Sequence, residues 1–200
     1  MTEKNKKLKW LSGVLAFSIL LNVALGVGIY VGRNNYQAAQ IAVENNYQRN
    51  FLALNDDMEQ IKLQLAQVLL TYGDEQMILG LSNLWRAVYG ALGSLNSLPL
   101  EMEELAKTGS FLRDTAEYSY YLLRKQAAAG SMSSAQWDKL AEFYQRAEAI
   151  QTELDKIQAK VLNENWHFSD QTDAENAAIQ TAMRGIEEKI AAFPLIELEE

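Results

Sequence analysis

The run from Leu11 to Gly32 contains 22 residues without one charged side chain. As an α-helix it would extend about 33 Å, roughly the thickness of the hydrocarbon core of a bilayer. Trp10 and Tyr30 lie near its two ends, where aromatic rings favour the membrane–water interfaces. Residues 11–32 are therefore predicted to cross a membrane once as a helix, and the rest of the chain must fold outside the lipid.

The charges around this run predict its orientation. Four lysines against Glu3 give residues 1–10 a net charge of +3, and only Arg33 follows the run directly. Because lysine and arginine are retained on the cytoplasmic side, we expect residues 1–10 to be a cytoplasmic basic tail and the chain from about residue 34 to be extracytoplasmic. A cleavable signal peptide is the alternative. Its apolar core would be unusually long, and Val23-Ala24-Leu25 is a poor cleavage site, so we favour an anchor.

The membrane segment also carries a hypothesis of self-association. Gly28 and Gly32 form a G-x-x-x-G pair, a spacing that lets two membrane helices approach closely. Asn22 places an amide near the expected bilayer centre, where it would gain from a hydrogen-bonding partner. The alternative is that glycine is simply common in membrane helices.

Apolar residues beyond the span recur at alternating steps of three and four, which is typical of amphipathic helices. Such stripes are formed by Tyr47, Phe51, Leu54, Met58, Ile61, Leu65, Val68 and Tyr72, by Ile78, Leu81, Trp85, Val88, Leu92 and Leu95, and by Leu140, Phe143, Ala147, Ile150, Leu154, Ile157 and Val161. No window alternates apolar and polar residues for long enough to indicate a strand. We therefore predict an all-α protein in which residues 34–192 form an antiparallel bundle of about four long helices.

Turn and capping residues predict where these helices end. The expected segments run from near Ala38 to Gly73-Asp74, from before Ile78 to about 96–99, from Phe111 to about Ala128, from an N-cap at Ser134 to about Val161, and, more weakly, from about Asp173 to Ala192. Residues 193–200 are expected to be a short tail.

Composition excludes several classes of chemistry. The chain has no cysteine and one histidine, His167, so we expect no disulfide, no thiol chemistry and no histidine-based metal site. It lacks the nucleophile-elbow, phosphate-loop and dinucleotide-binding motifs, and no cofactor is expected. The total charge of −8 leaves −11 beyond the basic tail, which disfavours nucleic acid. Carboxylates are abundant, but solvated helix faces usually carry them. We predict a non-enzymatic protein without catalytic residues.

A family resemblance begins directly after the anchor. The run Glu44-Asn45-Asn46-Tyr47-Gln48-Arg49 with Phe51 resembles the start of the helical region in the YpeB family of spore germination proteins. Further similarities follow in the same order, at Trp85, Leu98-Pro99-Leu100, Phe111-Leu112, Glu117-Tyr118-Ser119-Tyr120, Trp137, Leu140, Tyr144 and Trp166. Phe193-Pro194-Leu195-Ile196 resembles the family's junction into C-terminal PepSY domains, so the chain is either a fragment that ends there or a shortened relative.

The resemblance implies a protein of the spore inner membrane that acts with a cortex-lytic enzyme of the SleB type. We expect the helical bundle to support localisation or stability of that enzyme by presenting aromatic rings and amides to it. Asn45, Tyr118 and Tyr120 are the candidate contact residues, with core packing expected for at least one of the tyrosines.

Two alternatives belong to other classes. A ligand-sensing helical bundle would need a separate transducing subunit, because only about ten residues are expected on the cytoplasmic side. A polar-lined pocket between helices would favour it. An enzyme of unfamiliar type would need a pair of carboxylates across a cleft.

Overall fold

The structure, a computed structural model, describes residues 3–71, 73–98, 106–128, 131–163, 168 and 173–192. Its elements are α1 (Glu3–Leu70), α2 (Asp74–Asn96), α3 (Ala106–Ala127), α4 (Ser134–Asn163) and α5 (Asp173–Ala191). No strand occurs in these ranges, which confirms the all-α prediction. The chain divides into two compact parts, residues 1–43 and residues 44–200, and each is described by itself below.

The first part consists of the N-terminal section of α1. Every side chain described between Trp10 and Val43 is exposed, whereas the side chain of Leu11 lies outside the described part. α1 is the one described helix that is long and apolar enough to cross a membrane. A core helix of a soluble protein can pass the same test, but such a helix would be buried, and none of this apolar window is. The helix therefore fits a single-pass membrane anchor.

α1 begins at Glu3 and has no break between the apolar run and Ala38, so the predicted start near Ala38 was too late. No proline interrupts residues 33–43, and a helix that is already formed adds residues at little cost. The bilayer orientation, the absence of cleavage and the association through Asn22, Gly28 and Gly32 stay predictions. A side chain added at either glycine would have open space around it in this single chain.

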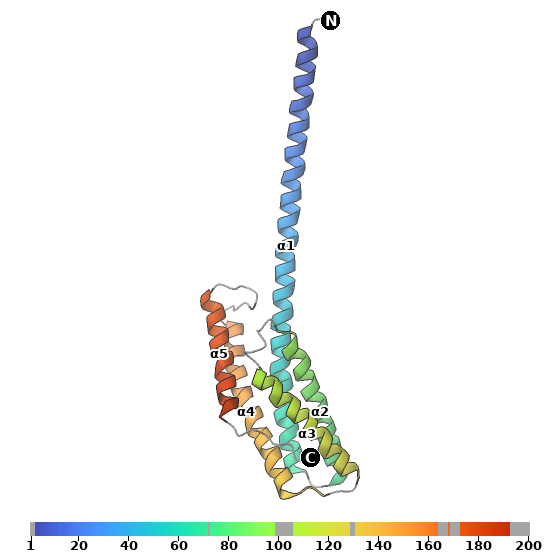
Figure 1. The fold of residues 1–200 in the computed structure, drawn as a ribbon, viewed down its shortest axis with the longest axis vertical. Helices are drawn as coiled ribbons and strands as arrows, with labels where there is room; N and C mark the ends of the chain where they lie inside the picture. The colour runs from blue at the N-terminus through green and yellow to red at the C-terminus, as the bar shows by residue number, and fades with distance from the viewer. Residues whose placement is uncertain are drawn as a thin grey trace. The chain divides into compact units, whose positions relative to one another are not determined.

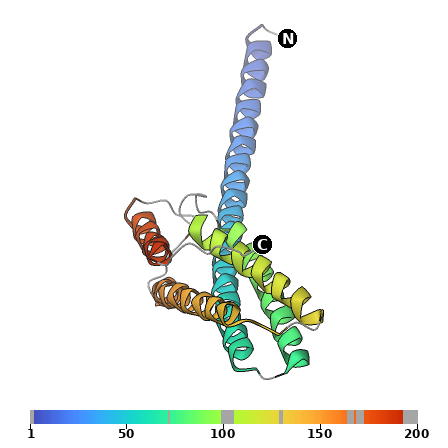
Figure 2. The ribbon, with the colours of Figure 1, turned by 60° about the horizontal axis from the view of Figure 1, so that its bottom comes forward.

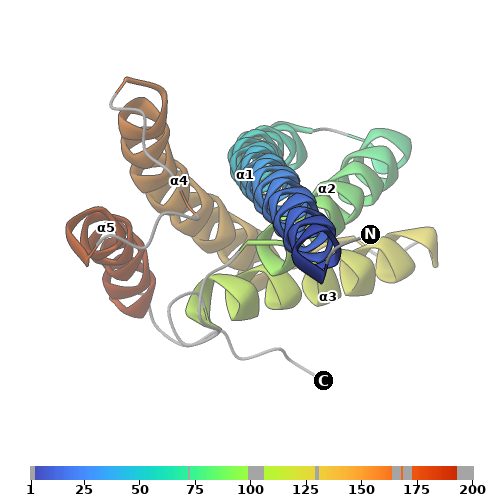
Figure 3. The same ribbon diagram turned by 90° about the horizontal axis from the view of Figure 1, so that it is seen from above.

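In the second part, successive helices run in opposite directions, down along α1 and α3 and back along α2 and α4 (Figure 1). α2 lies beside α3, and α4 lies beside α5 (Figures 2 and 3). The buried core contains the predicted stripe of α1 from Phe51 to Val68 and that of α4 from Leu140 to Ile157. Tyr72 and the side chain of Val161 lie outside the described residues.

The stripe on α2 differs from the prediction. The fully buried side chains are Leu81, Leu84, Val88 and Ala91, again at steps of three and four, whereas Trp85 is 38% exposed. Leu84 rather than Trp85 therefore faces the core. A leucine and an alanine on this face let α2 come close to its neighbours, which an indole at the same place would prevent.

Two capping arrangements correct the predicted starts of helices. α4 is capped by Ser133 and not by Ser134, because Ser133 Oγ accepts the Gln136 N–H (3.3 Å) and Gln136 Oε1 accepts the Ser133 N–H (2.9 Å). This reciprocal pair is a capping box. α3 starts at Ala106 and not at Phe111, because Glu187 of α5 accepts hydrogen bonds from Lys107 N (2.9 Å) and Thr108 N (3.0 Å).

Between α1 and α4, Asn55 forms hydrogen bonds with Gln151, Asp155 and Gln158. These contacts join the bundle section of α1 to the second half of α4. A polar cluster at one level of an apolar interface favours one register of the two helices, because sliding would leave its buried amides without partners.

Between α1 and α2, glycine leaves room for the larger groups of the partner helix. A side chain on Gly80 would meet Val68 Cγ2 at 2.9 Å, and one on Gly90 would meet Asp57 Oδ1 at 3.0 Å. Ser94 Oγ donates a hydrogen bond to Asp57 Oδ2 (3.3 Å). Burial raises the pKa of Asp57, the Ser94 hydrogen bond lowers it, and the neighbouring Asp56 raises it further, with a net upward shift.

The raised pKa predicts a pH dependence that Asp57→Asn removes. A carboxyl whose pKa is higher in the folded state binds protons more readily there, so its contribution to stability is present at low pH and is lost as the pH rises through the folded pKa. We expect Asp57→Asn to be as stable as the parent or slightly more stable at about pH 7. Near about pH 4 it should lack the stabilisation that the parent gains when Asp57 is protonated. Denaturant unfolding at the two pH values measures this.

Asp56→Asn is the matched control, because Asp56 is exposed and one residue away. It should alter the pH dependence less than Asp57→Asn does. An Asp57→Asn variant that is strongly destabilised at neutral pH would contradict the assignment.

Candidate functional site

The two candidate tyrosines of α3 have different environments. Tyr118 is 5% exposed, its ring centroid lies 5.6 Å from that of Phe143, and Lys139 Nζ lies 5.2 Å above the ring. Tyr120 is 49% exposed. Tyr118 is thus the core tyrosine that was expected of the pair, and the ring of Tyr120 is accessible at the surface.

Tyr120 joins an exposed aromatic surface, defined here as Trp85, Tyr89 and Tyr120. The ring centroids of Trp85 and Tyr89 are 4.9 Å apart with edge-to-face geometry, and those of Trp85 and Tyr120 are 6.4 Å apart. Tyr89 is 55% exposed. The two α2 residues are one turn apart and so share one side of the helix, and the packing of α3 beside α2 brings Tyr120 to them. Large aromatic groups held together and exposed are typical of protein-binding surfaces.

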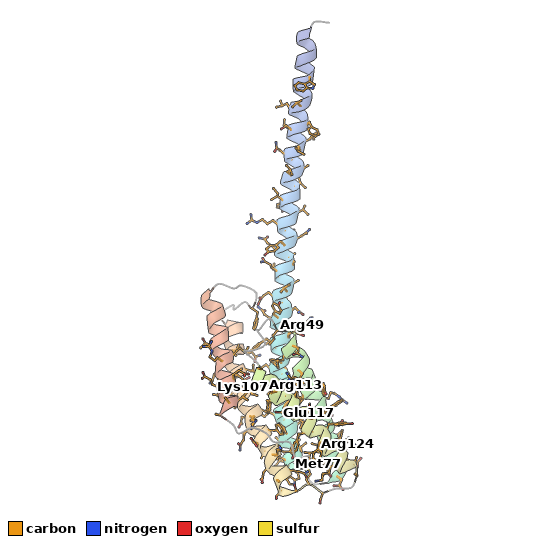
Figure 4. The ribbon with its side chains drawn as sticks, viewed as in Figure 1. Arg49, Met77, Lys107, Arg113, Glu117 and Arg124 are labelled. Atoms are coloured by element: carbon orange, nitrogen blue, oxygen red, sulfur yellow. The ribbon has the colours of Figure 1, made fainter. Side chains whose placement is uncertain are left out.

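A hollow of about 450 Å³ adjoins the aromatic surface on α3. It is lined by Glu117, Tyr120, Tyr121, Arg124 and Lys125. Glu117 and Arg124 lie about two turns apart along α3 (Figure 4). Two basic groups and one carboxylate give the hollow an excess of positive charge, although the chain as a whole carries −8. The hollow is therefore electrostatically complementary to a carboxylate group.

Sequence reasoning placed Trp85 in the core stripe and so missed its part in this surface. The signal was present in the sequence, because Leu81, Leu84, Val88 and Ala91 form a second stripe at helical spacing. Choosing between the two required the partner helices.

Asn45, the third candidate, is exposed on α1. Its neighbour Glu44 is 6% exposed, and Glu44 Oε1 accepts the Phe168 N–H (2.8 Å) and a hydrogen bond from Gln48 Nε2 (2.9 Å). The Phe168 ring lies 5.5 Å from that of Phe51. Glu44 thus holds Phe168 against α1. The motif that begins at Glu44 therefore has a structural part that sequence reasoning did not identify, and Asn45 is not brought near Trp85 or Tyr120 by any described contact.

One carboxyl on α3 has the raised pKa that a general acid would need. Burial raises the pKa of Asp114, and Glu117 adds to the shift, whereas Arg146, Arg113 and Lys139 oppose it. Asp114 does not line the hollow beside it. Its surroundings are a charge cluster in which Arg113 and Glu117 of α3 meet Lys139 and Arg146 of α4.

A second hollow, of about 490 Å³, lies where α1 meets α2. It is lined by Gln67, Leu70, Thr71, Gln76, Leu79, Gly80 and Asn83. Leu70 and Leu79 are 76% and 62% exposed, so this is an open surface depression and not the enclosed polar pocket that a ligand sensor would need. Within the described ranges no three His, Asp or Glu residues are grouped to hold a metal ion, and His167 lies outside them.

The known proteins to which this sequence is similar share one family name. The family described as YpeB N-terminal matches residues 35–170. Proteins named "Sporulation protein YpeB" are 24% identical in Oceanobacillus iheyensis over 193 residues and 26% identical in Halalkalibacterium halodurans over 192 residues, in each case 92% of this chain. The Bacillus subtilis protein of that name is 26% identical over 87% of this chain. The alignment spans 42% of the length of each relative. No solved structure matches the chain.

Proposed function

Because the chain belongs to the YpeB N-terminal family, we propose that it is a membrane-anchored, non-enzymatic sporulation and germination protein that supports a cortex-lytic enzyme of the SleB type. The enzyme is bound outside the membrane by the helical bundle, at the aromatic surface of Trp85, Tyr89 and Tyr120. Binding there keeps the enzyme in place or protects it from degradation until germination.

The observation that carries the proposal is the exposure of these three rings together. Of the three tyrosines on α3, Tyr118 lies in the core, whereas Tyr120 and its neighbour Tyr121 are 49% and 40% exposed. An aromatic cluster in water costs free energy that a protein partner recovers by burying it. The basic hollow beside Tyr120 adds charge complementarity, which favours one partner over others and fixes its orientation.

The N-terminal helix supplies the second part of the function. A single-pass anchor confines the bundle to a membrane surface, and residues 1–10, with a net charge of +3, favour a cytoplasmic N-terminus. The bundle is then on the same side as the cortex, where a lytic enzyme acts. Confinement to one surface raises the effective concentration of the bundle for an enzyme held at that surface.

The test is co-purification. The full chain, solubilised in mild detergent, should capture a co-expressed SleB-type enzyme of a spore-forming relative. A YpeB protein of full length serves as the comparison. If only the longer protein captures the enzyme, the bundle is a scaffold without the contact and the proposal fails.

Activity assays address the enzymatic alternative. We expect no muramidase or amidase activity from the purified chain on cortex peptidoglycan. Activity that disappears when a single carboxylate such as Asp114 is replaced by its amide would contradict the non-enzymatic part of the proposal.

A further inference from the structure

Residues 34–43 of α1, called the stem here, lie between the predicted span and the bundle. They contain no charged residue, and every one of them is exposed. Tyr36 is 64% exposed, Ile41 62% and Val43 44%. Lipid accounts for the exposure of the apolar residues described between 13 and 32. The stem is expected in water, where exposed tyrosine, isoleucine and valine on an uncharged helix are unfavourable.

The apolar residues of the stem continue a pattern that begins in the span. Leu25, Ile29, Gly32, Tyr36, Ala39 and Val43 follow one another at alternating steps of four and three, and Asn22 precedes them by three. These are the a and d positions of a heptad repeat, with Asn22, Ile29, Tyr36 and Val43 at a. Because α1 is an unbroken helix from Glu3 to Leu70, the positions form one stripe, called the α1 stripe here.

The α1 stripe is not the stripe that packs into the core of the bundle. The core-facing positions of α1 nearest the stem are Phe51, Tyr47 and Glu44. The same spacing continues backward through Gln40, Gln37 and Arg33, which are polar. In the described part of the chain, one face of α1 is therefore buried back to Glu44, and every residue of the α1 stripe is exposed.

We propose that a second copy of this chain covers the α1 stripe, forming a parallel two-stranded coiled coil from Asn22 to Val43. Two copies anchored in one membrane have the same orientation, so identical stripes meet in register, residue against the same residue. Gly32 and Ala39 at d alternate with Ile29, Tyr36 and Val43 at a, which lets large side chains pack beside small ones.

Charge restricts contact between two copies of this chain to the stem. The chain beyond residue 10 carries −11, so two copies repel each other over most of their surfaces. Residues 34–43 carry no charge and allow close approach. Asn22 occupies an a position, where one asparagine hydrogen-bonds its counterpart across the axis and favours a dimer in one register.

The absence of cysteine makes the proposal directly testable. Ala39→Cys, Val43→Cys and Ile41→Cys are introduced singly into the full chain, reconstituted in lipid vesicles at low protein density and oxidised mildly. A disulfide needs Cα atoms within about 7 Å, which facing a or d positions satisfy and the outer face of a coiled coil does not. We expect dimers from the first two variants and none from Ile41→Cys, with equal thiol labelling of all three.

A second pair of variants tests whether the α1 stripe forms the contact while the cysteine stays at residue 39. Added to Ala39→Cys, Val43→Glu should abolish most of the dimer, because it places two carboxylates face to face, whereas Ile41→Glu should leave the dimer unchanged. Both side chains are exposed in the single chain, so neither change disturbs the core of the bundle.

Each remaining outcome overturns the proposal. Equal dimer from Ala39→Cys and Ile41→Cys indicates random collision, and no dimer from any stem variant indicates a monomeric stem. A crossing at the Gly28 and Gly32 pair alone would let the helices diverge beyond the span. It would give dimer from Gly28→Cys but not from Val43→Cys.

Discussion

Trp85→Ala is expected to reduce capture of the SleB-type enzyme by the full chain at least about tenfold, while the thermal midpoint of the bundle changes little. Central aromatic residues of a protein interface commonly contribute 2 kcal/mol or more to binding, and about 1.4 kcal/mol corresponds to a factor of ten. Trp85 contacts both Tyr89 and Tyr120 but is 38% exposed and does not face the core. Titration of the enzyme onto immobilised chain measures the dissociation constant.

Leu79→Ala is the matched control, because Leu79 is also an exposed apolar residue of α2 and lies at the other hollow. It should bind the enzyme as the parent does. Equal binding by the parent, Trp85→Ala and Leu79→Ala would show that α2 does not carry the contact. A large fall in thermal midpoint for Trp85→Ala would instead assign the indole to the fold.

Glu187→Ala is expected to lower the free energy of unfolding by about 2–4 kcal/mol, because it removes an ionised acceptor from the start of a helix. The Glu187 carboxylate accepts hydrogen bonds from Lys107 N, Thr108 N and Thr108 Oγ1, at 2.9, 3.0 and 2.9 Å. Lys107 stands at the start of α3 (Figure 4). Without the carboxylate, these buried donors lose their partner and α5 loses a contact with α3. Urea unfolding followed by circular dichroism measures the change.

Glu188→Ala provides the comparison, since Glu188 is exposed and adjacent on α5. It should alter the free energy of unfolding by less than about 0.5 kcal/mol. Glu187→Gln should fall between the two, because an amide oxygen accepts the same hydrogen bonds without the charge. If Glu187→Ala and Glu188→Ala unfold alike, α3 does not depend on this cap.

The aromatic surface shows what helical periodicity can and cannot predict on α2. Both Trp85 and Leu84 lie on stripes with helical spacing, and periodicity alone does not choose between two stripes one residue apart. The choice depends on which face the neighbouring helices cover, so the exposure of Trp85 follows only from tertiary packing. On α4 the apolar stripe has no such rival, and its prediction from Leu140 to Ile157 is confirmed.

The helix starts differ in the same way, because one cap is visible in the local sequence and another comes from a distant residue. A capping pair within four residues, Ser133 with Gln136, is visible in the sequence, and only the assignment to Ser134 was off by one position. The cap of α3 by Glu187 comes from a residue 79 positions away from Thr108. No local pattern indicates it.

Sequence patterns were enough to predict the properties that repeat along a single helix, namely the uncharged run from residue 11 to 32, the all-α fold and most of the core stripe on α1 and α4. These depend on hydrophobicity and on a period of 3.6 residues, which are local. Tertiary structure alone decided that Glu44 holds Phe168, that Glu187 caps α3 and that Tyr120 meets Trp85. A polar group or an exposed ring acquires its neighbours from elements distant in the chain, and their positions exist only once the helices have packed.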